Sequence, residues 1–204
     1  MEIWTIISEQ WQQQSIIEVF AVLAAVTYVW LAAEESSWCW PFGFLGTILY
    51  AFIYWDVSLV FQTLLNVYYV GMALWGFITW RRKGLDSLEI SRMSFNLHMA
   101  IIVGGIAASG FIYLCASYWL LYDLLLIDII ITVFSLTTTY LTVKKKLENW
   151  IYWTVINTAS IYLLIETELY LSILLMFVYI LIALKGLNQW LATYSENELK
   201  HAVG

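Results

Sequence analysis

The chain has 204 residues, of which 62% are hydrophobic and 12% are charged, and its formal net charge at pH 7 is -6. Soluble domains carry about 25% charged residues, so this composition, with a mean hydropathy of +0.79, excludes a water-soluble globular protein. The two cysteines, Cys39 and Cys115, do not have the spacing of metal ligands. We therefore expect a membrane protein that needs no metal and no cofactor.

The chain begins with a polar stretch, residues 1–16, that contains Trp4 and Trp11. This stretch lacks the basic start that a cleavable signal peptide requires. Tryptophan rings prefer the depth of the lipid headgroups. We therefore expect a short segment that lies on the membrane surface.

Seven apolar runs follow, and each is predicted to be a membrane-spanning helix. They are Ile17–Ala33, Gly43–Trp55, Leu59–Trp80, Leu97–Trp119, Leu124–Val143, Ile151–Ile165 and Leu169–Trp190. The runs are continuous, whereas the strands of a membrane barrel alternate apolar and polar residues, so helices are favoured. The second and sixth runs are shorter than the about 20 residues that a span needs, which predicts tilted helices, a thinned bilayer, or helices that extend into polar-looking flanks.

The nine basic residues fall in three places: residues 81–92, residues 144–146, and Lys185 with Lys200 near the end of the chain. With seven spans, all three places lie on one side of the membrane. Basic loops are retained in the cytoplasm, so this side is predicted to be cytoplasmic. The N-terminus then lies outside and the C-terminus inside. The loop between the first two spans is the exception, because it holds two glutamates and no basic residue.

The two ends of the chain repeat each other. Identical residues stand 112 positions apart in the pairs Tyr28 and Tyr140, Trp38 and Trp150, and Tyr50 and Tyr162. They stand 110 positions apart in the pairs Leu59 and Leu169, Tyr69 and Tyr179, Gly76 and Gly186, and Trp80 and Trp190. We therefore predict an all-α integral membrane protein with seven helices in a 3+1+3 parallel pseudo-repeat, whose substrate site lies near mid-depth between the triplets.

The predicted organisation follows from these observations. The parts are an interfacial segment at 1–16, the first three-helix repeat at 17–80, a cytoplasmic loop at 81–96, a linker helix at 97–119, the second three-helix repeat at 120–190, and a cytoplasmic tail at 191–204. Apolar outer faces occur on every membrane bundle, so the formation of homo-oligomers is left open.

Amides in the third span are candidate substrate ligands. Gln62 and Asn66 are four residues apart and share a helix face, which Tyr69 extends. Amides donate and accept hydrogen bonds, which suits hydroxyl groups, a pyrimidine edge or a carboxamide. The alternative is that these side chains bond neighbouring helices together.

The sixth span offers a second pair on one face, Trp153 and Asn157. The indole could stack on a heteroaromatic ring and attract a cationic one, while the amide fixes its orientation. The alternative is that Trp153 anchors the helix at the membrane interface.

Three further polar residues are candidates for contact with a substrate. Thr137 lies in the fifth span, where its alternative role is a hydrogen bond to the carbonyl four residues earlier. Glu18 and Asp128 occupy matching places near the predicted outer ends of the first and fifth spans. They form either an acidic vestibule that attracts a cation or anionic partners of the helix N-termini.

Other functions lack a signal in this sequence. There is no phosphate-binding loop of the G-x-x-x-x-G-K-[ST] kind, and no His/Glu motif or nucleophile with its base. We therefore expect neither an enzyme nor an ATP-driven pump, and no nucleic-acid partner. A subunit that only assembles a larger membrane complex stays an alternative to a transporter.

Several segments resemble one known family over about Glu18 to Trp190. The resemblance is carried by Trp38–Gly43, Asp128, Lys144–Trp150, Trp153 and Asn157. These segments are similar to the PnuC family, bacterial vitamin facilitators with a SWEET-like fold. The resemblance implies a bacterial inner-membrane protein that carries a B-type vitamin by facilitated diffusion. It also implies that a cytoplasmic vitamin kinase traps the substrate.

Departures from the family pattern bear on the substrate. The family usually has Leu-Gln where this chain has Leu65 and Asn66, and a tyrosine where it has Val60. Family members carry nicotinamide riboside, and relatives carry thiamine or riboflavin. The altered amide favours thiamine slightly over nicotinamide riboside, and riboflavin comes third because it lacks a positive charge.

Overall fold

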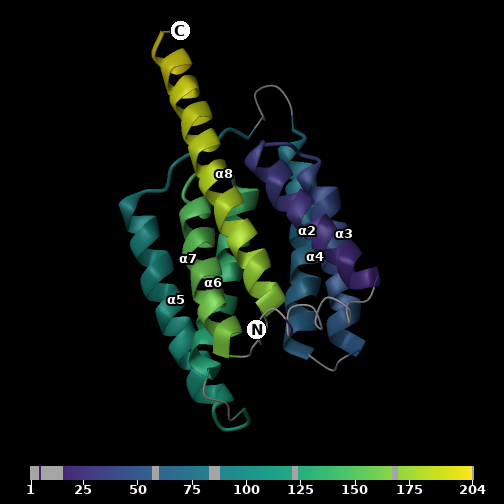
Figure 1. The fold of residues 1–204 in the computed structure, drawn as a ribbon. Coiled ribbons are helices and arrows are strands. Elements are labelled where there is room, and N and C mark those ends of the chain that lie inside the picture. The colour runs from purple at the N-terminus through teal and green to yellow at the C-terminus, as the bar shows by residue number, and fades with distance from the viewer. Residues whose placement is uncertain are drawn as a thin grey trace.

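The computed structural model describes Thr5 and residues 16–56, 60–82, 88–120, 124–166 and 170–203. Seven helices lie in these ranges (Figure 1): α2 (Ile16–Ala33), α3 (Cys39–Asp56), α4 (Val60–Trp80), α5 (Phe95–Ala116), α6 (Leu125–Val143), α7 (Asn149–Glu166) and α8 (Tyr170–Val203). The described residues contain no strand, only an isolated bridge between Ser91 and Lys146. The all-helical prediction is therefore confirmed.

Two of the predicted spans are longer than the sequence suggested. Helix α3 begins at Cys39 rather than Gly43, and α7 begins at Asn149 rather than Ile151, so each has 18 residues. Of the three predicted explanations for the short runs, extension into polar-looking flanks is the one that the structure shows, because both helices start in segments that contain polar or proline residues. Pro41 is tolerated there because the first turn of a helix does not need its N–H group.

Helix α8 also exceeds its predicted end at Trp190 and continues to Val203, for a total of 34 residues. Figure 1 shows this last part, in yellow, projecting beyond the other helices. The expected tail is therefore helical up to Val203. Its Leu, Ala, Glu and Lys residues have high helix propensity.

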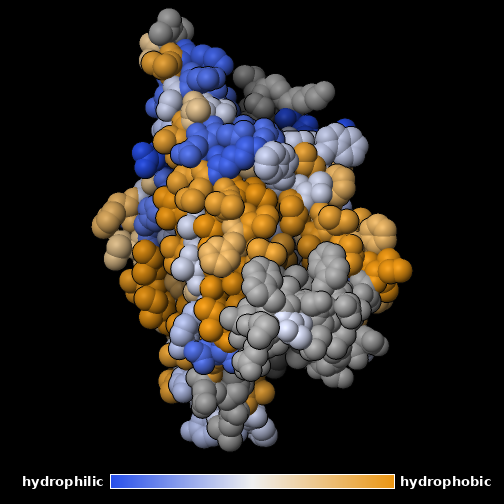
Figure 2. All heavy atoms as spheres, viewed as in Figure 1, coloured by the Kyte–Doolittle hydropathy of each residue, from blue (hydrophilic) through white to orange (hydrophobic). Residues whose placement is uncertain are grey.

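The surface agrees with a protein that spans a membrane. Among the described residues, α2, α5, α6 and α8 contain stretches long and apolar enough to cross a bilayer. On the face drawn in Figure 2, apolar residues occupy the middle of the molecule and polar residues lie at the end from which α8 projects. We call this end, which carries Arg81, Arg82, Arg92 and residues 144–146, the basic end.

Six of the helices form a ring. In the first half α3 packs against both α2 and α4, and in the second half α7 packs against both α6 and α8. The halves meet where α4 contacts α6 and where α2 contacts α8, while α5 packs on α6 outside the ring (Figure 1). This arrangement is the predicted 3+1+3 repeat, with α5 as the linker helix.

The packing of two tryptophans fixes the register of the repeat at an offset of 110 positions. Trp40 packs on Gly76, and Trp150 packs on Gly186 in the same way, because a Cβ at either glycine would lie within 2.8 Å of the indole. Trp40 and Trp150 are thus the equivalent pair, whereas Trp38 is 64% exposed. The predicted pairing of Trp38 with Trp150 was wrong, and the other identities at the larger spacing do not reflect the repeat.

Tryptophans join the two halves near the basic end. Trp80 of the first half donates from Nε1 to the carbonyl of Val143 at 3.0 Å. Trp190 of the second half donates to the carbonyl of Ala32 at 3.2 Å. The two indoles lie 5.8 Å apart, and Trp40 and Trp150 pack edge-to-face against them. We call these four residues, Trp40, Trp80, Trp150 and Trp190, the tryptophan cluster.

Ion pairs add to this junction. Lys145 Nζ lies 2.5 Å from Glu35 Oε1, and Lys185 pairs with Glu34. The hydrogen bonds from Lys185 and Gln189 lower the pKa of the Glu34 carboxyl below its usual value. The two glutamates of the first loop, which set it apart in the charge pattern, therefore bind lysines of the other half.

Candidate substrate-binding site

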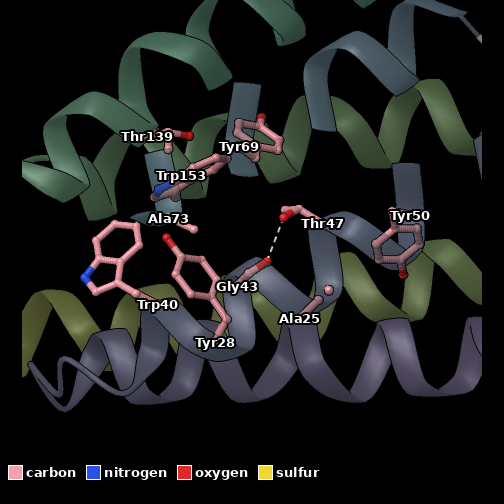
Figure 3. Close-up of a pocket in the computed structure, with 11 residues that line it drawn as sticks. Ala25, Tyr28, Trp40, Gly43, Thr47, Tyr50, Tyr69, Ala73, Thr139 and Trp153 are labelled. Atoms are coloured by element: carbon pink, nitrogen blue, oxygen red, sulfur yellow. Dashed lines mark hydrogen bonds between the residues drawn. The ribbon is translucent and has the colours of Figure 1, made fainter. Parts of the chain in front are cut away.

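A cavity of about 310 Å³ lies between the two halves, and we call it the central cavity. Its aromatic lining residues are Tyr28, Tyr50, Tyr69, Trp150, Trp153 and Tyr179, and its polar ones are Thr47, Asn66, Thr142 and Asn157. A second hollow of about 110 Å³ adjoins it and shares six of its lining residues. Figure 3 shows this second hollow, with Tyr28 beside Gly43 and the side chains of Trp153 and Tyr69 across from them.

Four of the predicted site residues come together here. Asn66 and Tyr69 are three residues apart on α4, and Trp153 and Asn157 are four apart on α7, so each pair presents one helix face to the cavity. The two helices belong to opposite halves. Contact of these residues with a substrate stays a prediction, but their placement around one cavity is what that prediction requires.

The two amides are buried. Asn66 is 7% exposed and Asn157 is 8% exposed. The Asn157 side chain forms no hydrogen bond with any other described residue. Because Asn157 lines the central cavity, its amide is available to form a hydrogen bond with a ligand there.

A hydrogen bond holds the indole of Trp153. Its Nε1 donates to the hydroxyl of Thr142 at 3.2 Å. That hydroxyl also lies 3.0 Å from the carbonyl of Thr138 and 3.1 Å from Oδ1 of Asn149. Trp153 therefore lines both hollows from a position that this hydrogen bond constrains.

The two halves supply their large rings from different helices. In the first half Tyr28 on α2 lies against Gly43 on α3, where an added Cβ would approach the ring to 2.8 Å. At the equivalent positions of the second half, Thr138 replaces Tyr28 and Trp153 replaces Gly43. Each half therefore offers one ring and one small residue at these two positions, and the cavity is asymmetric although the backbone is repeated.

Three other predicted site residues, Thr137, Asp128 and Glu18, lie elsewhere. Thr137 bonds to the carbonyl of Val133 at 3.1 Å and lines neither hollow, which is the alternative we considered. Asp128 lines a separate cavity of about 490 Å³ between α4, α5 and α6. Glu18 is half-buried in the first turn of α2. The side chain of Gln62 is outside the described residues.

Several lining residues were missed by the sequence analysis. Thr142 rather than Thr137 lines the central cavity, and so do Tyr28, Tyr50 and Tyr179. Tyr179 could have been found, because it is the repeat partner of Tyr69. The others carried no comparable signal.

The described lining of the central cavity consists of apolar, aromatic and uncharged polar side chains. No described residue around the central cavity carries a charge at neutral pH. Within the described parts of the chain, no three His, Cys, Asp or Glu residues stand close enough together to hold a metal ion.

The fold and the cavity define a membrane transporter built from two three-helix halves. The sequence model of the nicotinamide mononucleotide transporter family matches residues 15–192. The chain belongs to this family, whose members are transporters and not enzymes.

Known relatives agree with this assignment. The chain is 22% identical over 212 residues to the nicotinamide riboside transporter PnuC of Escherichia coli (strain K12), covering 88% of this chain and 87% of that protein. The protein of the same name from Shigella flexneri gives the same values. A crystal structure of the vitamin B3 transporter PnuC is similar with a TM-score of 0.75 and 17% identity, covering 95% of this chain and 90% of that one.

Proposed function

We propose that this protein carries a positively charged heteroaromatic vitamin by facilitated diffusion, with thiamine slightly favoured over nicotinamide riboside. One observation carries the proposal: the buried amide of Asn157, unpartnered among the described residues, stands beside the Trp153 indole in a cavity between the two halves. An amide and an indole together suit a flat ring with polar edges. Such a ring also stacks on the tyrosines around it.

The lining favours a cation without a phosphate group. Aromatic faces attract a cationic ring by about 0.5–2 kcal/mol each, and the central cavity has six aromatic residues. A phosphate would lose its hydration there without meeting a basic side chain among the described lining residues, which is costly. We therefore favour a vitamin or nucleoside over a nucleotide as the substrate.

Two substrates fit this chemistry, and different observations favour each. The shorter amide of Asn66 lies in the central cavity and leaves more room than a glutamine would, which supports thiamine. The printed names of the relatives support nicotinamide riboside.

Transport would proceed by alternating access, as the two halves rock around the central cavity. The tryptophan cluster and the ion pairs of Glu34 and Glu35 support a basic end that is closed in this conformation. Because basic loops are kept inside, we assign the basic end to the cytoplasm, the N-terminus to the outside, and the protein to a bacterial inner membrane. A cytoplasmic vitamin kinase would trap the substrate, and Glu18 and Asp128 would attract a cation at the outer end.

Binding and transport are tested separately. Purified protein is titrated with thiamine, nicotinamide riboside and riboflavin, with tryptophan fluorescence as the readout. In sealed vesicles without ATP, the internal ligand concentration should rise to the external level and stop. Accumulation well beyond that level under a proton or sodium gradient would contradict facilitated diffusion. Failure of all three vitamins to bind would contradict the proposed substrate class and favour an assembly subunit.

A further inference from the structure

We propose that Thr142 is a positioning residue that sets the plane of the Trp153 ring, so that this ring presents its face to the substrate. The inference rests on the proposed function, because it deepens the role of the same cavity. It starts from the contact between Trp153 Nε1 and Thr142 Oγ1 at 3.2 Å. Thr142 itself is 2% exposed and lines the central cavity.

The chemistry of the hydroxyl group makes Thr142 a fixed acceptor. A threonine hydroxyl has one hydrogen to donate and two lone pairs that accept. The hydrogen has two acceptors within reach, the carbonyl of Thr138 at 3.0 Å and Oδ1 of Asn149 at 3.1 Å. Whichever of them it serves, a lone pair remains for the indole N–H of Trp153.

Asn149 in turn holds Thr142 in place. It is fully buried at 0% exposed, and its Nδ2 donates to the carbonyl of Lys146 at 2.7 Å. This bond orients the amide so that Oδ1 faces Thr142. With the hydroxyl hydrogen of Thr142 directed to Oδ1 of Asn149, three side chains form a series of hydrogen bonds from the start of α7 to the ring in the cavity. Such chains orient a functional group more firmly than packing alone.

The first half shows that the fold does not need this arrangement. The residues 110 positions before Asn149, Thr142 and Trp153 are Cys39, Ala32 and Gly43. None of these three residues has a side chain that could form the same series of hydrogen bonds, although α2 and α3 are arranged as α6 and α7 are. The chain of hydrogen bonds belongs only to the half that supplies the indole, which points to a role in the site.

A double-mutant cycle tests the proposal. Thr142→Val removes the acceptor at nearly the same volume, and we expect about fivefold weaker binding of the vitamin, as for the loss of one hydrogen bond. Thr142→Ser keeps the hydroxyl and should bind like the wild type. In a Trp153→Phe background, which has no ring N–H, Thr142→Val should change the dissociation constant by less than about twofold. An equal loss in both backgrounds would show that Thr142 only supports the fold.

A second readout needs no ligand. With ¹⁵N-labelled tryptophan, the indole N–H resonance of Trp153 is identified by its loss in Trp153→Phe. Thr142→Val should shift this resonance and speed its exchange with water, while Thr142→Ser leaves both unchanged. An unmoved resonance would overturn the proposal.

The two readouts separate this inference from the proposed function. Unchanged binding in Trp153→Ala would contradict the proposed site, whereas the resonance still decides whether Thr142 holds the indole. Lost binding in Trp153→Ala together with normal binding in Thr142→Val would contradict only the role of Thr142.

Discussion

Glu35 and Lys145 occupy the same position in the two repeats, and their side chains pair across the boundary between the halves. Each lies two residues beyond the end of the first helix of its half and has a positive φ, 56° for Glu35 and 48° for Lys145. The hydrogen bonds around them match as well: Ser36 bonds back to Leu31 and Lys146 to Leu141, both at 2.9 Å. Two identical helix ends thus carry opposite charges.

The charges at these positions should be interchangeable as a pair. Lys145→Glu alone places like charges together, and we expect a lower melting temperature in detergent, by the equivalent of roughly 1.5–3 kcal/mol for one charged hydrogen bond. Adding Glu35→Lys should restore most of the loss, because the backbone at the two sites is equivalent. A double variant no more stable than Lys145→Glu would show that the pair does not hold the halves together.

The space beside Gly43 should control ligand affinity. A Cβ at residue 43 would lie 2.8 Å from Cδ2 of Tyr28. Gly43→Ala therefore forces the ring of Tyr28, which lines both the central cavity and the adjoining hollow, to move. We expect vitamin binding to weaken at least about tenfold, and overpacking to cost about 1–3 kcal/mol of stability. The matched control is Gly71→Ala, where nothing lies within 4 Å of the added atom. Equal affinities of the two variants in a binding titration would contradict the prediction.

The number of helices and their grouping were predictable from the sequence. A helix that crosses lipid must be long and apolar and must satisfy its own backbone hydrogen bonds. Apolar runs of this length can be recognised in the sequence alone. The repeat was also visible, but its register was not. Trp38 and Trp40 both stand near a spacing of 110 from Trp150. Only the close packing of an indole on Gly76 and Gly186 decides between them.

The lining of the cavity was predictable only in part. In a helix of a soluble protein, the polar face shows which side points to solvent. Lipid is as apolar as a protein interior, so in a membrane helix the sequence has no periodic pattern that tells the lipid-facing side from the buried side. Asn66 and Asn157 were found because a buried amide is rare in a membrane helix. Among the threonines of α6, nothing in the sequence distinguishes Thr142, which lines the central cavity, from Thr137, which does not.

The pair of Glu34 and Lys185 should make stability depend on acidity. Hydrogen bonds from Lys185 and Gln189 lower the pKa of Glu34 from its usual 4.5. A lowered pKa stabilises the folded protein above the usual value, and this contribution is lost as the pH falls through the lowered pKa. The melting temperature should therefore decrease when the pH is lowered below about 4.5. Glu34→Gln should lower the melting temperature at neutral pH and reduce its decrease at acidic pH. If the variant and the wild type show the same dependence of melting temperature on pH, the pair of Glu34 and Lys185 does not cause it.

Cys39 offers a native reporter for opening of the basic end. Its thiol is 0% exposed and packs within the same core as the tryptophan cluster. In a Cys115→Ser background, so that only this thiol reacts, we expect slow modification by maleimide. Trp80→Phe removes the bond to the carbonyl of Val143 and should speed the reaction. The control is Trp119→Phe, which changes a ring that is 87% exposed. Equal rates in both variants would show that the cluster does not close this end.

The amide of Asn157 should be required for binding. Asn157→Ala removes the only amide side chain that α7 contributes to the described cavity lining, and we expect at least about tenfold weaker binding, or roughly 1.4 kcal/mol. Its folding should be unimpaired, because the amide has no partner to lose among the described residues. The matched control is Thr158→Ala, since that side chain is exposed and bonds to the carbonyl of Thr154. Calorimetric titration of both variants decides the matter: if Asn157→Ala binds as tightly as Thr158→Ala, the substrate does not contact this amide.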